Sequence, residues 1–232
     1  MKYLFITFLS MVFLFSICSA AERLELKSQK DKEGYSLGYQ FGQSLKSQGV
    51  DVNVDAYISG IRDFLDGKEP MMTQEEMRAT VSELQKRLVA DRQKELKEMA
   101  EQNLIQSKVF LEENKKKVGI KTLPSGLQYK ILAEGSGKTP VATDTVMVHY
   151  KGLLINGTEF DSSYMRGQAA SFQVNSVIPG WNEALQLMKE GAKWQLFIPP
   201  NLAYGERGGG TIIPPNSVLI FEVELISVGP AK

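Results

Sequence analysis

The sequence predicts an α+β protein whose C-terminal part is an antiparallel half-barrel sheet wrapped on one short helix. A long spacer helix and a small all-α N-terminal dimerisation unit precede this sheet. Three observations support the fold class. Residues 71–117 contain no proline and no glycine but carry many charges, as long helices do. Eight of the nine prolines and 13 of the 20 glycines lie at or beyond Pro124. From Leu127 onward, apolar and polar residues alternate as they do in strands.

Length and composition limit the possible functions. The chain has 232 residues, enough for about two domains. Its 27 basic residues balance 27 acidic ones, so no net field favours nucleic acid, and we expect no nucleic-acid partner. One His and one Cys disfavour a zinc site, a disulfide framework and an enzyme with a nucleophile activated by His. We therefore expect no metal site.

Residues 1–20 are typical of a secretory signal peptide. Met1-Lys2 supplies a basic start, the run from Tyr3 to Ala21 is uncharged, and small residues follow at 19–21. We expect cleavage after Ala20 or Ala21 and an exported protein that is periplasmic, associated with the outer membrane or at the cell surface. One alternative is an uncleaved anchor, since about 20 residues can just span a bilayer. Another is a lipoprotein attached through Cys18, for which Ile17 fits poorly.

Residues 21–70 are expected to form a helical dimerisation domain with two short helices between 28 and 67. In the first helix Gly34, Gly38 and Gly42 recur every four residues and so share one face. Each glycine costs about 1 kcal/mol of helix stability, which suggests that another backbone approaches closely there. About 40 residues cannot bury a robust core alone. We therefore expect a homodimer through residues 28–67. The alternative is a two-helix cap packed on the rest of the same chain.

Residues 71–118 are expected to form one long linker helix. Thr73 and Glu76 fit a capping box at its start. Its narrow apolar seam fades beyond Leu88, so the helix should be solvated nearly all round. This pattern favours a spacer arm between two bodies over a coiled coil, and Val118-Gly119 should end it.

Residues 119–232 are expected to form the functional domain, with five or six strands and one helix. The helix should run from Trp181 to Met188, because Pro179-Gly180 precedes it and Gly191 follows. A sheet curled over one short helix can leave an aromatic-lined cavity beside the start of that helix.

The side chains expected near this cavity are mostly aromatic. The candidates for its walls are Phe160, Phe172, Trp181, Tyr204 and Phe221, and the polar candidates are Tyr150, Asp161 and Arg166. From composition alone, a Trp that begins a helix is more often a core residue than a catalytic one. His149 should face away from Tyr150, because neighbours on a strand point to opposite faces. Asp161 has no evident carboxylate partner for acid–base chemistry. The Gly208-Gly209-Gly210 run is not followed by a helix and so does not predict a phosphate site.

Six ordered sequence blocks then carry a resemblance. They are Val148-His149-Tyr150-Lys151-Gly152, Gly157-Thr158-Glu159-Phe160-Asp161-Ser162-Ser163, Val177-Ile178-Pro179-Gly180-Trp181, Ala203-Tyr204-Gly205, Ile212-Ile213-Pro214-Pro215-Asn216 and Leu219-Ile220-Phe221-Glu222-Val223-Glu224-Leu225. Together they resemble an FKBP-type peptidyl-prolyl cis-trans isomerase domain over roughly residues 122–228. The upstream part is similar to the Mip-like (macrophage infectivity potentiator) branch, including the segments 31–38 and 123–129. This resemblance implies an exported, V-shaped homodimer with isomerase domains on long helical arms. A role in surface adhesion or virulence follows only from the name of the branch.

The resemblance also implies roles for individual residues. Trp181 matches the aromatic floor of the family's pocket, and the matching apolar walls are Tyr150, Phe160, Val177, Ile178, Ile213 and Phe221. In the family, the Ile178 N–H and the Tyr204 hydroxyl bind carbonyls of substrates or of macrolide inhibitors. Asp161, linked to Tyr150 and Arg166, matches the polar edge. Ala170 and Gly209 stand where many members have an aromatic wall and a bulky loop residue, and both should widen the rim.

We therefore expect a peptidyl-prolyl cis-trans isomerase that needs no cofactor. It would accelerate X–Pro rotation in exported proteins by stabilising the twisted amide in an apolar pocket, and would act as a dimeric folding helper. Its partners would be proline-containing unfolded or exported polypeptides. The alternative is a dimeric holdase, or clamp, that binds unfolded chains and in which catalysis is incidental.

Overall fold

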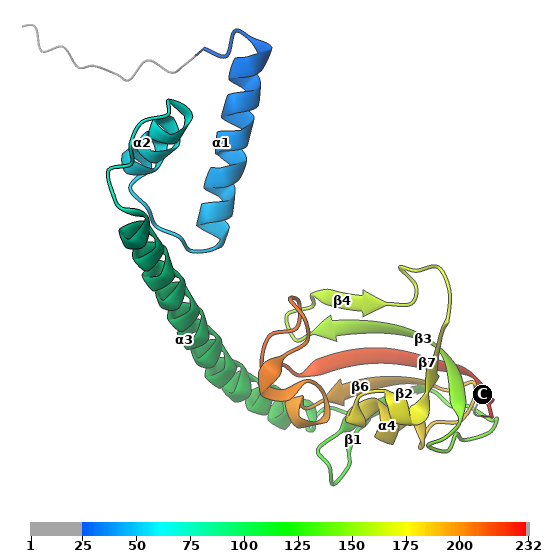
Figure 1. The fold of residues 1–232 in the computed structure, drawn as a ribbon. Coiled ribbons are helices and arrows are strands. Elements are labelled where there is room, and N and C mark those ends of the chain that lie inside the picture. The colour runs from blue at the N-terminus through cyan, green and yellow to red at the C-terminus, as the bar shows by residue number, and fades with distance from the viewer. Residues whose placement is uncertain (1–24, 231–232) are drawn as a thin grey trace, which may run out of the picture. The chain divides into compact units, whose positions relative to one another are not determined.

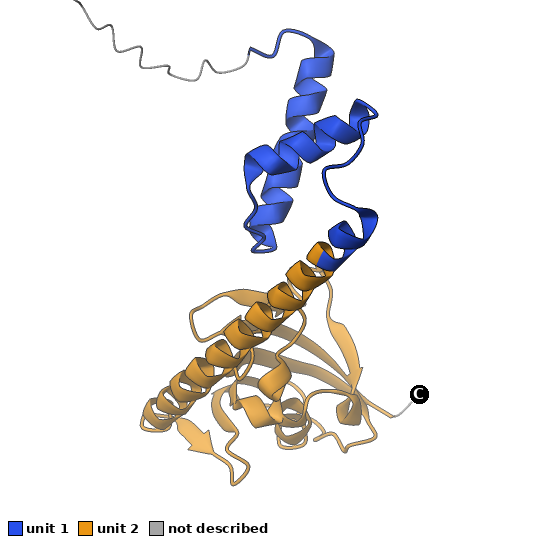
Figure 2. Cartoon of the chain, turned by 60° about the vertical axis from the view of Figure 1, so that its left-hand side comes forward, with its two compact units in different colours: residues 1–79 blue, residues 80–232 orange. Residues whose placement is uncertain are grey.

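The structure is a computed structural model that describes residues 25–230. The signal peptide expected over residues 1–20 and the first residues of the expected 21–70 domain lie outside these described residues. The chain divides into two compact units, residues 1–79 and residues 80–232 (Figure 2). No helix within residues 25–230 is both long and apolar enough to cross a membrane.

The first unit contains two helices with side-chain caps. Helix α1 spans Gln29–Ser47, and its N-terminus carries a capping box in which Ser28 and Asp31 exchange hydrogen bonds of 3.1 and 2.8 Å. Helix α2 spans Val54–Leu65, and the Asn53 side chain accepts a hydrogen bond from the Ala56 N–H at 2.9 Å. The two helices expected between residues 28 and 67 are thus present.

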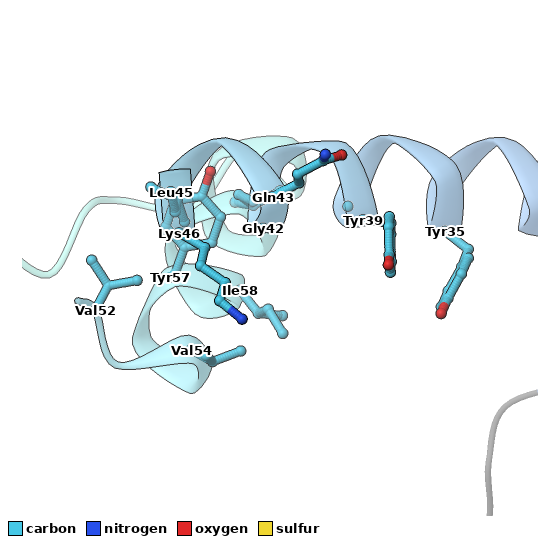
Figure 3. A pocket seen from close by; sticks show the side chains of 12 residues that line it. Tyr35, Tyr39, Gly42, Gln43, Leu45, Lys46, Val52, Val54, Tyr57 and Ile58 are labelled. Atoms are coloured by element: carbon cyan, nitrogen blue, oxygen red, sulfur yellow. The ribbon is translucent and has the colours of Figure 1, made fainter. Parts of the chain in front are cut away.

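The described part of this unit has no buried side chain in either α1 or α2. Tyr39 is 66% exposed and Phe64 is 85% exposed. An open groove of about 700 Å³ lies between the two helices, and its lining includes Tyr35, Tyr39 and Gly42 of α1 and Ile58 of α2 (Figure 3). The apolar faces of both helices therefore remain uncovered within one chain.

Helix α3 spans Gln74–Asn114. As expected, Thr73 caps it, because Glu76 accepts a hydrogen bond from the Thr73 N–H at 2.8 Å and its own N–H donates to Thr73 Oγ1 at 3.2 Å. The helix ends four residues earlier than expected. The Gln128 side chain donates to the Leu111 carbonyl at 2.9 Å and accepts from the Asn114 amide at 2.9 Å, so a distant side chain binds the last turn.

The expectation that α3 is solvated nearly all round is wrong for its C-terminal third. Ser107 and Asn114 are 2% and 1% exposed, respectively. The Phe110 ring packs against Phe197 of the sheet, with the ring centroids 6.1 Å apart. This part of α3 lies against the sheet in the same compact unit (Figure 2).

The second unit is built on a seven-stranded antiparallel sheet in the order β1-β2-β6-β7-β3-β4, with β5 also paired to β3 (Figure 1). The strands are β1 Ile120–Thr122, β2 Gln128–Ala133, β3 Thr145–Leu154, β4 Glu159–Ser162, β5 Ala170–Gln173, β6 Lys193–Ile198 and β7 Leu219–Gly229. Five or six strands were expected. Strand β1 has three residues, too few for alternation to reveal it, and forms only by pairing with β2.

Helix α4 spans Pro179–Leu185 and packs against one face of the sheet (Figure 1). It is shorter than the expected Trp181–Met188. The Leu187 N–H donates to the Ala184 carbonyl three residues back, at 3.0 Å, so the chain tightens before Met188. Three short 3₁₀ turns complete the unit: η1 Val174–Ser176, η2 Pro200–Leu202 and η3 Gly205–Arg207.

The core lies between α4 and the inner face of the sheet, where the expected alternation is confirmed. The buried core residues of the three central strands are Val146, Val148, Tyr150 and Leu154 of β3, Trp194, Leu196 and Ile198 of β6, and Leu219, Phe221, Val223 and Leu225 of β7. Trp181, Ala184 and Leu185 of α4 pack against them. This face of the sheet carries the candidate site.

Candidate active site

Trp181 is the centre of an aromatic cluster at the start of α4. It is 4% exposed, and three rings meet it nearly edge-on. Its ring centroid lies 5.2 Å from Tyr150 at 90°, 5.2 Å from Phe221 at 84° and 5.9 Å from Phe172 at 81°. Edge-to-face contacts of this kind stabilise aromatic groups beyond the burial of their area. The cluster is therefore held in one arrangement from three strands and one helix.

The remaining apolar candidates surround this cluster. Phe160 of β4 meets Phe221 edge-on at 5.4 Å. Val177 and Ile178, which immediately precede α4, are half-buried against the core, as are Phe160 and Phe172. Ile213 is buried in the same core although it lies in the loop before β7. Gly152 of β3 makes the close packing possible, because an added Cβ would lie 2.7 Å from both Phe160 and Phe221. The sequence patterns did not single out Gly152.

Polar groups are few, and three of them form one closed network. The Tyr150 hydroxyl donates to Asp161 at 2.5 Å, and Arg166 donates to Asp161 at 2.5 Å. Arg166 also donates to the Tyr150 hydroxyl at 2.6 Å. The carboxylate of Asp161 is thus oriented from two sides at the edge of the aromatic cluster.

This network shifts the acidity of its members. Burial raises the pKa of Asp161, but the hydrogen bonds from Tyr150 and Arg166 and the charge of Arg166 outweigh burial and hold that pKa below its usual value. Burial and the hydrogen bond to Asp161 raise the pKa of Tyr150. Asp161 is therefore ionised and Tyr150 neutral at pH 7.

Two hydrogen-bond donors at the candidate site remain free. Within the described residues, the Ile178 N–H donates no hydrogen bond, whereas its carbonyl accepts from Trp181 and Asn182 at 2.9 and 3.0 Å. The Tyr204 hydroxyl likewise has no partner within residues 25–230, and Tyr204 is 44% exposed. Tyr204 differs from the other aromatic candidates in lying outside the packed core. Its ring and Ile213 both lie next to Gly209, where an added Cβ would be 3.2 and 3.1 Å from them.

Other residues considered from the sequence lie elsewhere or serve packing. His149 is in contact with Ser163 Oγ at 3.1 Å and stacks on Tyr164, away from the cluster. Ala170 is half-buried on β5, opposite Val148 of β3. Trp194 of β6, which is not among the site residues expected from the sequence, stacks on Tyr129 with centroids 4.3 Å apart. No group of three or more His, Cys, Asp or Glu side chains in the described range is placed to hold a metal ion.

Comparison with known proteins identifies both parts of the chain. Residues 136–226 match the family model of the FKBP-type peptidyl-prolyl cis-trans isomerase, and residues 30–131 match the model of the domain amino terminal to it. Two relatives are the outer membrane protein MIP of Legionella longbeachae and the peptidyl-prolyl cis-trans isomerase Mip of Coxiella burnetii. The first is 47% identical, over 92% of this chain and 91% of its own. The second is 46% identical, over 98% and 99%.

A solved structure is also similar over most of the chain. The crystal structure of FkpA from Escherichia coli matches with a TM-score of 0.74 and 40% identity, covering 90% of this chain and 100% of the other.

Proposed function

The chain belongs to the family of FKBP-type peptidyl-prolyl cis-trans isomerases, and from this premise we propose that the Trp181 cluster is the surface on which it rotates X–Pro bonds. The observation that carries this assignment is the edge-on packing of Tyr150, Phe172 and Phe221 around one buried indole. These rings leave an apolar environment beside Ile178, which offers a free N–H. A prolyl ring seated on Trp181 would bring the carbonyl of its residue to that donor.

The apolar environment can accelerate rotation without a covalent step. Rotation about a peptide bond faces a barrier of about 18–20 kcal/mol, because the twisted bond loses resonance. A planar amide is more charge-separated than a twisted one, so an apolar surface disfavours the planar ground state relative to the transition state. An acceleration of about 10⁴-fold requires only about 5.4 kcal/mol. No cofactor takes part in this mechanism.

The polar groups would select and orient the substrate. We assign the Ile178 N–H and the Tyr204 hydroxyl to substrate carbonyls, because neither donor has a partner within residues 25–230. Ile178 immediately precedes α4, and the Tyr204 ring lies next to Gly209, as does the core residue Ile213. The Asp161 carboxylate, fixed by Tyr150 and Arg166, would face the twisting amide at the cluster edge. Phe160, Val177 and Ile213 would complete the apolar walls. Macrolides that occupy this site should compete with substrate.

The experiment that tests the site compares two buried tryptophans of the same domain. Trp181→Leu should lower kcat/KM for a four-residue peptide with one X–Pro bond by about tenfold or more, since the floor of the site is lost. Trp194→Leu is the matched control. It also removes a buried indole, but from the Tyr129 stack away from the cluster. Equal losses in the two variants, after correction for the folded fraction, would show that the Trp181 cluster is not the site.

We further propose that the chain is a homodimer joined through residues 28–67. The support is physical: α1 and α2 bury none of their side chains within one chain and leave the groove of about 700 Å³ open. A Cβ added at Gly34, Gly38 or Gly42 would have no atom of the rest of the chain within 4 Å, so this stripe is uncovered in one chain. A second copy would cover both the stripe and the exposed aromatic residues beside it. Two linked sites would increase avidity for one long client chain.

The proposed clients are proline-containing unfolded polypeptides that have been exported. The support is the signal-like sequence of residues 1–20, together with the name of the Legionella relative as an outer membrane protein. We place the protein in the periplasm or at the outer membrane. Cell fractionation tests this location, and recovery of the protein with the cytosolic fraction would contradict it.

A further inference from the structure

The loop of residues 205–216, between Tyr204 and β7, contributes directly to the proposed site. It carries the buried Ile213, and its first residue follows Tyr204. Gly209 and Ile213 exchange two backbone hydrogen bonds of 2.9 and 3.1 Å. The Asn216 N–H donates to the Gly205 carbonyl at 2.8 Å and so closes the loop at its two ends. The position of this loop therefore depends on where Asn216 is held.

Helix α3 holds Asn216 and its neighbour through three hydrogen bonds. Ser107 Oγ donates to the Asn216 carbonyl at 2.7 Å, and Asn103 Nδ2 donates to the Pro215 carbonyl at 2.8 Å. In return, Asn216 Nδ2 donates to the Ala100 carbonyl at 3.1 Å. Ser107 and Asn216 are 2% and 7% exposed, so water does not readily replace these bonds.

The backbone of Asn216 shows how firmly this contact defines the loop. Its φ is +52°, and no other non-glycine residue among those described has a positive φ. This conformation costs about 1–2 kcal/mol for most residues, although asparagine tolerates it better than most. It persists where the surroundings determine it, and here the N–H, the carbonyl and the side chain of Asn216 are all bound.

We propose that α3 is more than a spacer, and that Asn103 and Ser107 are positioning residues that hold the 205–216 loop ready for substrate through Asn216. This inference rests on the proposed function, because that proposal places Tyr204 and Ile213 in the site. When the contacts with α3 are lost, the loop spends part of its time away from the binding-competent position. The apparent affinity for substrate is then reduced in proportion to the fraction of molecules whose loop is in place. The rate of isomerisation in the bound complex, kcat, is unchanged. Substrate binding must, in turn, strengthen the docking of α3 by the same factor.

The test uses the full chain with Ser107→Ala, which removes one bond from the helix side, and Asn216→Gly, which removes one from the loop side and keeps the positive φ accessible. One buried hydrogen bond typically changes an equilibrium by about 2- to 12-fold. Because the loop is docked most of the time in wild type, KM for an X–Pro peptide should rise by less than this factor, up to about threefold in each variant, with kcat unchanged. Amide hydrogen exchange at Gly209 and Ile213 follows the opening equilibrium itself and should accelerate by the full factor of about 2- to 12-fold.

Gln106→Ala is the matched control. Gln106 neighbours Ser107 on α3, and both residues line a small cavity of about 110 Å³. Within the described residues, Gln106 forms no hydrogen bond with the loop. This variant should keep the KM and the exchange rates of wild type.

Two results would overturn the inference. One is an unchanged KM with unchanged exchange at Gly209 and Ile213 in both variants. The other is a fall in kcat with no change in KM, which would indicate a general loss of the folded site. A wild-type chain without isomerase activity would instead refute the proposed function, and hydrogen exchange would still decide whether α3 orders the loop.

Discussion

Gly152 gives a direct test of whether the Phe160 and Phe221 rings belong to the substrate site. It lies on β3, paired with Asp161 of β4 and with Phe221 of β7. A Cβ added there would be 2.7 Å from both Phe160 Cζ and Phe221 Cε1. Carbon atoms in contact lie about 3.5–4.0 Å apart, so Gly152→Ala requires both rings to move by roughly 1 Å.

This displacement should reduce both stability and activity. Overpacking a core typically costs about 1–3 kcal/mol, and each kcal/mol lowers Tm by about 2–4 °C in a unit of this size. Because Phe221 meets Trp181 edge-on at 5.2 Å, a displaced ring also disturbs the indole. A misplacement of about 1 Å can cost about 100-fold in rate, so we expect kcat/KM to fall by about 10- to 100-fold.

The assay is isomerisation of an X–Pro peptide, together with thermal unfolding followed by circular dichroism. Gly229→Ala on β7 is the matched control, because its added Cβ would lie 3.8 Å from the Thr145 carbonyl, an ordinary contact. Neither glycine has a positive φ, so the backbone accepts alanine at both positions. A Gly152→Ala variant that loses stability but keeps the kcat/KM of wild type would refute the placement of these rings in the site.

Two further predictions concern charge and assembly. The folded-state pKa of Asp161 lies below its unfolded value of about 3.9, so the stabilisation it provides is complete above about pH 4 and is lost as the pH falls through the folded pKa. The urea midpoint of Asp161→Asn should therefore lie below that of wild type at pH 7 and approach it at pH 3, and a gap independent of pH would contradict this. In α1, Gly38→Leu should stabilise the helix of one chain but block the approach of a second copy. Gly38→Ala should weaken the proposed dimer less, because its side chain is smaller. In one chain an added Cβ at Gly38 meets nothing within 4 Å, so both variants should still fold. Light scattering measures the mass, and a Gly38→Leu variant that remains a dimer would exclude close packing at this stripe.

Much of the domain pattern could be predicted from local sequence. The capping box of Thr73 and Glu76, the proline- and glycine-free run and the alternation on β3, β6 and β7 depend on neighbouring residues, so they can be identified without the fold. The end of α3 could not be predicted in this way. It depends on Gln128, which reaches the Leu111 carbonyl only after the chain has turned back.

The face of α3 that packs against the rest of its unit was missed for a related reason. Asn103, Ser107, Phe110 and Asn114 recur at helical spacing, but three of the four are polar, so they do not form the apolar face that indicates the buried side of a helix. A polar side chain becomes a buried contact only when a partner satisfies it, and these partners come from the loop before β7 and from β2. A regular spacing of small polar residues on an otherwise charged helix is the signal that could have revealed this face.

The candidate site, too, could be predicted from the sequence only in part. The sequence alone determined the residue types of the site, through ordered motifs that carry the aromatic residues, the single carboxylate and the Pro-Gly start of α4. The resemblance had already implied that Asp161 is linked to Tyr150 and Arg166. The tertiary structure alone decided that Gly152 makes room for two phenylalanine rings and that α3 holds the loop bearing Ile213. The physical reason is range: motifs record preferences of neighbouring residues, whereas packing contacts and hydrogen bonds also join residues that come together only in the folded chain. Ser107 and Asn216, for example, are 109 residues apart.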